Sequence, residues 1–374
     1  MSQQIAQIKE TVFTEAGEYY ATLMQDIEQS ASHIDFETFI FNLDPLGRKV
    51  AEHLAAASRR GVAVRLLLDG AGSSESSGAL ARQLSDAGVQ VRIYHPLPWN
   101  VRHWELAVPR LPWLTKLQRL LSSIHSRNHR KICMIDQHLV WVGSFNVSQL
   151  HLSAAQGGND WRDTALRLEG LELEHLQHAF NSAWDNDRSL IPRQIFSPMT
   201  FRLNHMHRRK LRLDLLKRMA QTRTRIWITN AYFVPIASVL RYLKKAARRG
   251  VDVRILLPGN SDIFFMTWAS AVFYQALLKA GVRIYEYTGG VLHAKIMILD
   301  DWMTVGSSNL DYLSFFRNLE AEIVVSLTQT KKTIEDRFLN DLTHAEELTI
   351  DDCPQRPWWR KLFGHLLLYV KRWL

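Results

Sequence analysis

Two long stretches of the chain repeat each other, and this duplication restricts the possible folds more than any other feature of the sequence. The segment AAASRRGVAVRLLLDG at positions 55–70 returns as KKAARRGVDVRILLPG at positions 244–259. In each copy a strand-like segment precedes an amphipathic helix, which closes with basic residues and a glycine, Gly61 or Gly250. A short strand rich in Val, Ile and Leu then follows, so each half repeats one strand–helix–strand unit.

The alternation of strands and helices predicts the fold class: α/β, with two pseudo-symmetric lobes, each a mostly parallel sheet flanked by helices. We expect an N-terminal lobe over residues 1–188, a C-terminal lobe over residues 189–350 and a basic amphipathic tail over residues 351–374. The first half also carries a basic insertion at about residues 95–123, which contains Trp99, Trp104 and Trp113. A loop of this length is usually functional or disordered, and the tryptophans argue against simple disorder.

Each half contains one copy of a polar motif, His-x-Lys-x4-Asp followed by Gly-Ser-x-Asn. Residues two apart in a strand face the same side, so the histidine and the lysine of each copy are expected to point into one site. The first copy supplies His129, Lys131, Asp136, Ser144 and Asn146, and the second supplies His293, Lys295, Asp300, Ser307 and Asn309. A single match could be a solvated strand end, but two matches at corresponding points of a duplication indicate a functional site.

These residue types suit the transfer of a phosphodiester group. A histidine acts as a nucleophile or a general acid near neutral pH, and two histidines can divide these roles. A lysine provides a positive charge for the phosphate oxygens of the transition state, and Ser and Asn add neutral donors. A metal site is the alternative, but a lysine two residues from the histidine would repel a cation and no Cys/His cluster is present. We therefore expect neither a metal nor an organic cofactor.

Composition narrows the kind of partner without choosing one. The net charge of +9 implies an acidic partner, either nucleic acid or an anionic membrane surface. Cys133 and Cys353 suggest neither a disulfide framework nor a zinc site, so a reducing compartment is expected. The start of the chain shows no secretory signal. The longest uncharged stretch, at residues 263–278, is too short to span a membrane and predicts a buried or interfacial helix.

With its duplicated motif, the sequence resembles the phospholipase D superfamily over almost its whole length. Within that superfamily it is most similar to the bacterial cardiolipin synthases of the short type, which lack N-terminal transmembrane helices. The residues that carry this closer resemblance are Glu37 in ETFIF, Asp69 in LLDG, Asp163 in WRDTALRLEG, Tyr232 and Pro235 in NAYFVP, and Asp311 and Glu320 in SSNLDYLSFFRNLE.

The resemblance implies that the two lobes bring His129 and His293 face to face at their interface. His129 is expected to form a covalent phosphatidyl-histidine, with His293 as acid and base. An alcohol then displaces the histidine; in cardiolipin synthases this alcohol is the terminal hydroxyl of a second phosphatidylglycerol, and glycerol leaves. Glu320 is expected to orient a histidine, with Asp163 as its counterpart in the first half. Both carboxylates join the serines and asparagines of the motif as expected substrate-site residues.

Two segments favour a lipid over nucleic acid as the acidic partner. One is the Trp-rich insertion, and the other is the C-terminal sequence PWWRKLFGHLLLYVKRWL. As a helix, the latter has a broad apolar face flanked by basic residues, which suits the headgroup region of an anionic leaflet.

The leading prediction is a cardiolipin synthase-like phosphatidyltransferase, peripheral on the cytoplasmic face of a bacterial inner membrane. Its expected partners are phosphatidylglycerol and the anionic membrane surface. The alternatives are another phosphatidyltransferase or a phospholipase D hydrolase, and, from a different substrate class, a nuclease.

Overall fold

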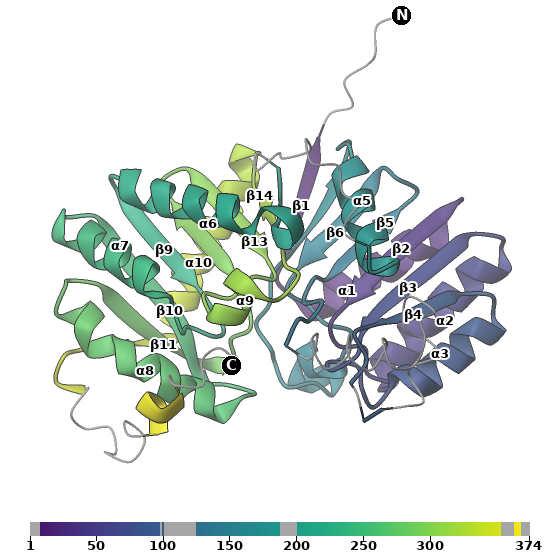
Figure 1. The fold of residues 1–374 in the computed structure, drawn as a ribbon, viewed down its shortest axis with the longest axis horizontal. Helices are drawn as coiled ribbons and strands as arrows, with labels where there is room; N and C mark the ends of the chain where they lie inside the picture. Colours follow the sequence, from purple (N-terminus) through teal and green to yellow (C-terminus); the bar gives the residue numbers. More distant parts are fainter. Residues whose placement is uncertain (1–7, 98, 101–124, 188–199, 353–362, 368–374) are drawn as a thin grey trace, which may run out of the picture.

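The chain forms two lobes that lie side by side, each built on one β-sheet (Figure 1). This computed structural model describes residues 8–97, 99–100, 125–187, 200–352 and 363–367. Most of the Trp-rich insertion and most of the C-terminal tail therefore lie outside the described residues. Among the residues described, the first sheet has the strand order β1-β7-β6-β5-β2-β3-β4 and the second has the order β15-β11-β10-β9-β12-β13-β14-β8. The predicted α/β class and two-lobed layout are confirmed.

The first lobe contains the first copy of the duplicated unit. Its elements are β1 (Lys9–Phe13), α1 (Ala16–Gln29), β2 (His33–Thr38), α2 (Pro45–Arg59), β3 (Ala63–Asp69), α3 (Ser77–Asp86), β4 (Gln90–Tyr94), β5 (Ile132–Ile135), β6 (Leu139–Gly143), the short 3-10 turns η2 (Gln149–His151) and η3 (Ala154–Gln156), β7 (Ala165–Glu169) and α5 (Glu174–Trp184). Gly61, just after α2, has a φ of 95°, as a helix-ending glycine requires.

The second lobe repeats this order. Its elements are β8 (Phe201–Leu203), α6 (Asn204–Gln221), β9 (Arg225–Thr229), α7 (Ala237–Arg248), β10 (Asp252–Asn260), α8 (Phe264–Leu278), β11 (Arg283–Val291), β12 (Ile296–Leu299), β13 (Trp302–Gly306), α9 (Tyr312–Phe316), β14 (Ala321–Val324), α10 (Thr328–Thr343) and β15 (Ala345–Leu348). Gly250 follows α7 with a φ of 86°, so the helix-ending glycines occur at the same point of both copies.

The sheets are mixed, which differs from the prediction that they are mostly parallel. Among the strands of the described residues, only β2, β3 and β4 in the first lobe, and β9, β10 and β11 in the second, pair in parallel. The motif strands β5 and β12 instead pair antiparallel with β6 and β13 through tight hairpins. Helical crossovers join parallel strands, whereas a tight hairpin can only join antiparallel strands, so the motif reverses the chain direction.

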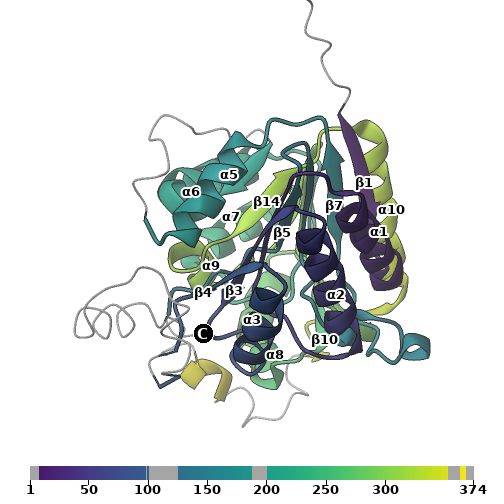
Figure 2. The ribbon, with the colours of Figure 1, turned by 90° about the vertical axis from the view of Figure 1, so that its right-hand side faces the viewer.

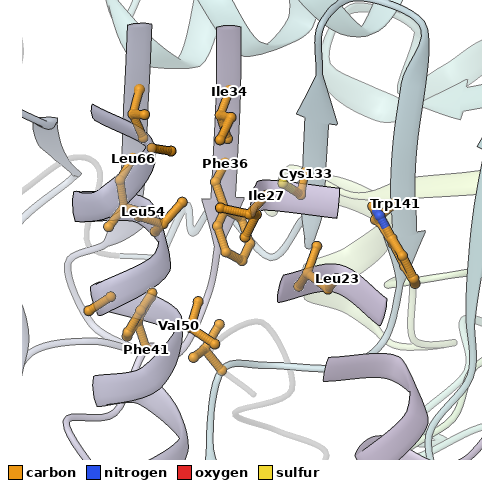
Figure 3. Packing of buried hydrophobic residues seen from close by; sticks show 14 of the residues in the cluster. Leu23, Ile27, Ile34, Phe36, Phe41, Val50, Leu54, Leu66, Cys133 and Trp141 are labelled. Carbon is orange, nitrogen blue, oxygen red and sulfur yellow. The ribbon is translucent and has the colours of Figure 1, made fainter. Parts of the chain in front are cut away.

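In the described part of the chain, the three largest clusters of buried apolar side chains form one layer within each lobe and one layer between the lobes. Helices α1, α2 and α3 cover the outer face of the first sheet (Figure 2), where Leu23, Ile27 and Leu54 pack on Phe36 and Leu66 (Figure 3). Helices α6, α7 and α8 form the matching core on the second sheet. The third layer joins the two sheets and draws on strands of both lobes, with β6 against β13 and β14. This shared layer includes residues of the motif strands β5 and β12 and holds the two lobes together.

The aspartates of the two motifs close the hairpins and tie them to the neighbouring strands. The Asp136 carboxylate accepts hydrogen bonds from the backbone N–H groups of Ala31, Ser32 and His33, at 2.7–2.9 Å. The Asp300 carboxylate accepts the same three bonds at the start of β9, from Arg223, Thr224 and Arg225, at 2.9–3.1 Å. Although burial acts to raise them, these bonds lower the pKa of each aspartate to about 2.

Replacing either aspartate by asparagine should destabilise the protein. We expect Asp136→Asn and Asp300→Asn each to lower the free energy of unfolding by about 1–3 kcal/mol, because an amide oxygen replaces a charged acceptor of several bonds. The stabilisation is present above the ordinary pKa of 3.8 and is lost as the pH falls through about 2. Denaturant unfolding followed by circular dichroism measures the effect. Asp301→Asn, at an exposed neighbouring position, is the control, and equal losses in all three variants would contradict the assignment.

Candidate active site

The two motif histidines line one cavity between the lobes. This cavity has a volume of about 380 Å³, and both His129 and His293 lie in its wall. Each histidine lies just before its motif strand, three residues ahead of β5 or β12, and each is almost fully buried. Much of the remaining wall is apolar or aromatic, and includes Phe39, Ile40, Trp161, Tyr232, Phe265 and Met266. The cavity therefore combines two titratable groups with a surface suited to an amphiphilic ligand.

Each histidine is paired with a carboxylate from the opposite lobe. His129 Nδ1 lies 3.1 Å from Glu320 Oε2, and His293 Nδ1 lies 2.8 Å from Asp163 Oδ1. The sequence predicted both carboxylates as histidine partners, but not that the pairs cross between the lobes. Because Nδ1 of each ring donates to a carboxylate, Nε2 keeps a lone pair for chemistry in the cavity.

Backbone hydrogen bonds cross the lobe interface at the same two places. The N–H of His129 donates to the carbonyl of Leu319, one residue before Glu320, at 2.9 Å. The N–H of His293 donates to the carbonyl of Arg162, one residue before Asp163, also at 2.9 Å. These two backbone hydrogen bonds between the lobes hold each histidine beside its partner carboxylate, whatever the side chains do.

Burial shifts the pKa values of the charged groups in the site. It lowers the pKa of His129 below its usual 6.5 and that of His293 to about 4, against the carboxylates that act to raise them. Although burial acts to raise it, the neighbouring histidine keeps the pKa of Glu320 low, and histidines do the same for Asp163. Both carboxylates therefore stay ionised while both imidazoles favour the neutral form.

The motif lysines lie beside the histidines, and both are buried. The ammonium group of Lys131 donates to the carbonyl of His129 at 2.7 Å, and that of Lys295 donates to the carbonyl of His293. Burial lowers the pKa of Lys131 to about 7 and that of Lys295 to about 8. Their mutual repulsion adds to the shift of Lys131. Burial disfavours the charged form of both lysines, so a bound anion that compensates their positive charge would stabilise the site.

The motif asparagines reach the cavity, whereas the motif serines support its wall. Asn146 Oδ1 accepts a hydrogen bond from the N–H of Ile40, and Asn309 Oδ1 accepts one from the N–H of Tyr232, both at 3.3 Å. Their amide groups thus have a fixed orientation in the cavity wall. The serines are fully buried behind it: Ser144 bonds to the backbone of Thr164, and Ser307 donates to Glu320.

Asp136 and Asp300 lie apart from this group. Their carboxylates accept backbone hydrogen bonds just after β5 and β12, at the ends of these strands far from the histidines. Neither residue lines the cavity. Of the twelve predicted site residues, the structure brings together the histidines, lysines, asparagines and crossed carboxylates, with the serines in direct support.

His151 is a site residue that the sequence reasoning missed. The N–H of Asn146 donates to His151 Nε2 at 3.3 Å, which leaves the ring proton on Nδ1, 2.7 Å from Asp163 Oδ2. In the second lobe Ser314 stands at the same distance along the chain from Asn309. Its Oγ accepts from the N–H of Asn309 at 3.2 Å and donates to Glu320 at 2.8 Å.

His151 supports the carboxylate of Asp163, and Ser314 supports that of Glu320. In each pair, the length of the supporting side chain compensates for the length of the carboxylate side chain. Glutamate is one methylene longer than aspartate, and the imidazole of His151 reaches further than the hydroxyl of Ser314. Each pair therefore combines one shorter and one longer side chain, Asp163 with His151 and Ser314 with Glu320. The sequence indicates His151 only when the two halves are aligned past the motif asparagines, where His151 stands opposite Ser314. The two residue types differ, so the motif itself does not include this position.

Two acidic residues from the family resemblance hold the loop before His129. The N–H of Asn128 donates to Asp69 Oδ2, and its side-chain amide donates to Glu37 Oε2, both at 2.8 Å. Glu37 is also paired with Arg130, at 3.2 Å. This buried network joins the ends of β2 and β3 to the first histidine.

Duplicated histidine, lysine and asparagine residues with crossed carboxylates, in a two-lobed α/β fold, define a phospholipase D-type site. A family model described as "Cardiolipin synthase, PLD-like domain" matches residues 23–184 and 215–342. Cardiolipin synthase B of Escherichia coli (strain K12) is 34% identical over 359 residues, which cover 91% of this chain and 82% of that protein. A cardiolipin synthase of Geobacillus sp. (strain WCH70) is 32% identical and covers 92% of this chain and 68% of that protein. The chain therefore belongs to the phospholipase D superfamily, among the cardiolipin synthase-like phosphatidyltransferases.

Solved structures share the fold at low sequence identity. Phosphatidylserine synthase of Haemophilus influenzae Rd KW20 has a TM-score of 0.72 and 12% identity, covering 99% of this chain and 96% of that one. Polyphosphate kinase of Porphyromonas gingivalis has a TM-score of 0.60 and 12% identity, covering 89% of this chain and 50% of that one. At this identity the likeness concerns the fold alone.

The compensation between the two supports can be tested by exchanging one for the other. His151→Ser should lower kcat by about tenfold to a hundredfold with a smaller effect on KM, because Asp163 would no longer be held against His293. The double variant His151→Ser/Asp163→Glu, which copies the second lobe, should recover part of that loss. Steady-state kinetics of both variants, with circular dichroism to check folding, make the comparison. A double variant no faster than His151→Ser would contradict the compensation.

Proposed function

We propose that this enzyme joins two phosphatidylglycerol molecules into cardiolipin and releases glycerol. The observation that carries the proposal is the pairing of two buried histidines with carboxylates in one largely apolar cavity. The similarity to two cardiolipin synthases, at 34% and 32% identity, supports the choice of lipid. The proposed reaction has two displacements at one phosphorus atom, with no change of oxidation state.

In the first step, His129 Nε2 attacks the phosphorus of the donor lipid. A P–N bond forms, the P–O bond to the headgroup glycerol breaks, and His293 gives the leaving oxygen a proton. Glu320 accepts the Nδ1–H of His129 and stabilises the positive charge that develops on this ring as it attacks. Without substrate, the pKa of His293 is low and its ring is neutral. The negative charge of a bound phosphate favours the protonated imidazole, so substrate binding allows His293 to act as an acid.

In the second step, the terminal hydroxyl of another phosphatidylglycerol takes the place of glycerol. His293 removes its proton, the oxygen attacks phosphorus, and the P–N bond to His129 breaks. Lys131 and Lys295 stabilise the charge on the non-bridging phosphate oxygens in both steps, and the amides of Asn146 and Asn309 donate to the same oxygens. The proton given in the first step is regained in the second, so the enzyme returns to its starting state.

We also propose that the enzyme works as a peripheral protein on the cytoplasmic face of a bacterial inner membrane. Within the described part of the chain, none of the helices combines the length and the apolar composition needed to cross a bilayer. The net charge of +9 favours binding to anionic phospholipids such as phosphatidylglycerol.

Either histidine variant should abolish lipid transfer. We expect His129→Ala and His293→Ala each to lower turnover by about a thousandfold or more, because each removes a group used in both steps. Mass spectrometry of products from phosphatidylglycerol in mixed micelles measures transfer. The control is His178→Ala, at a partly exposed position on α5 outside the cavity.

The products and the intermediate distinguish the proposal from its alternatives. Cardiolipin with glycerol supports it, whereas phosphatidic acid alone means that water is the acceptor and the enzyme is a hydrolase. Samples quenched with denaturing detergent at mildly alkaline pH, where a P–N bond to histidine survives, should carry a phosphatidyl adduct on the peptide that contains His129. An adduct on the peptide with His293 would reverse the roles of the two histidines.

The pH profile should follow the lowered pKa of the nucleophilic histidine. His129 must be neutral to attack phosphorus, and burial lowers the pKa of its imidazole from the ordinary 6.5. A lowered pKa keeps the ring neutral to a lower pH, so the acid limb of kcat/KM should lie clearly below pH 6.5. Initial rates in overlapping buffers test this, and an acid limb at or above 6.5 would contradict the neutral nucleophile.

A further inference from the structure

Helix α8 has no charged residue, yet several of its side chains are only partly covered by the described part of the chain. Its sequence FFMTWASAVFYQALL contains no acid or base, and only Met266, Ala269, Ser270, Tyr274 and Leu277 are buried. Phe264, at its first turn, is 65% exposed. A helix that is apolar all round is normally buried on all sides, so the uncovered side of α8 indicates contact with another apolar phase.

The described piece of the C-terminal tail packs on this side of α8. Residues 363–367 are helical, and a Cβ on Gly364 would lie 2.6 Å from the carbonyl oxygen of Trp268, so the two backbones are in close contact (Figure 1). The Phe363 ring lies 6.4 Å from the Trp268 ring. Phe363 and Leu366 are each 51% exposed and lie one helical turn apart, on the same side. We call the surface formed by Phe264, Trp268, Phe363 and Leu366 the α8 face.

The same turn of α8 also forms part of the catalytic cavity. Ile263, Phe265 and Met266 line the cavity that contains His129 and His293. Phe264 stands between these positions in sequence, and its ring lies 5.5 Å from that of Phe265. Apolar side chains therefore run without interruption from the α8 face to the wall of the cavity.

We propose that the α8 face docks onto the interfacial region of an anionic phospholipid bilayer, so that a lipid passes from the membrane into the catalytic cavity along α8. This inference rests on the proposed lipid substrate. Moving an acyl chain into water costs free energy for every methylene group exposed, so a path that stays apolar between membrane and cavity favours transfer. The net charge of +9 of the chain suits a bilayer with anionic headgroups.

Charge substitutions on the α8 face should weaken membrane binding. Phe264→Glu and Phe363→Glu should each lower the partition coefficient onto vesicles of phosphatidylglycerol and phosphatidylethanolamine by about tenfold, because one phenylalanine no longer leaves water. Sedimentation of the full chain with these vesicles measures binding. The matched control is Leu213→Glu, which adds the same charge at a 52% exposed apolar residue on α6, across α7 from α8 (Figure 1).

A second measurement separates docking from chemistry. Short-chain phosphatidylglycerol dispersed as monomers needs no membrane, so its turnover should be the same in the wild type and in all three variants. Unchanged vesicle binding by both phenylalanine variants would overturn the proposal and leave a protein partner for the α8 face. An equal loss in Leu213→Glu would also overturn it, since the effect would then be one of net charge. If the wild type binds vesicles through the α8 face but converts no lipid, the proposed reaction fails while the docking surface stands.

Discussion

Each histidine of the site is held by a carboxylate of the opposite lobe, and the arrangement of the whole molecule depends on this crossed pairing. Since His129 requires Glu320 and His293 requires Asp163, neither lobe alone contains a complete pair. All four groups are buried, and a buried charge that loses its partner typically costs about 3–5 kcal/mol. The pairs therefore add to the apolar layer between the sheets in favouring the docked lobes, and the same contact that completes the fold completes the site.

The duplication gives two half-sites with the same plan but different supports. In both, a lysine ammonium bonds to the carbonyl of its histidine and an asparagine is fixed by a backbone N–H. The carboxylates differ, because Asp163 is braced by His151 and Glu320 by Ser314. A two-step displacement needs two histidines in similar positions with different roles, and unequal supports give each ring a different electrostatic environment.

The repeat and its motif predict the two lobes and most of the residues gathered in the site, but not their detailed geometry. Spacing within one half cannot show which lobe's histidine a carboxylate reaches, so the crossing of Asp163 and Glu320 appears only in the tertiary structure. Asp136 and Asp300 illustrate a second limit of motifs, because a repeated residue can stabilise the hairpin instead of taking part in the chemistry. His151 was missed since its counterpart is a serine, and a comparison by residue identity sees no match there.

The uncharged stretch at residues 263–278 shows how one helix can meet several requirements at once. Tyr274 and Leu277 face the core of the second lobe, Met266 faces the catalytic cavity, and Phe264 faces outward. For a water-soluble substrate, the outward phenylalanine would add exposed apolar surface with no gain. For a lipid, the same exposure lowers the barrier to transfer, because the acyl chain exchanges one apolar surface for another instead of entering water. The absence of charge along α8, with apolar side chains on both its cavity side and its outer side, is therefore the property that links the proposed phosphoryl-transfer site to a substrate held in a bilayer.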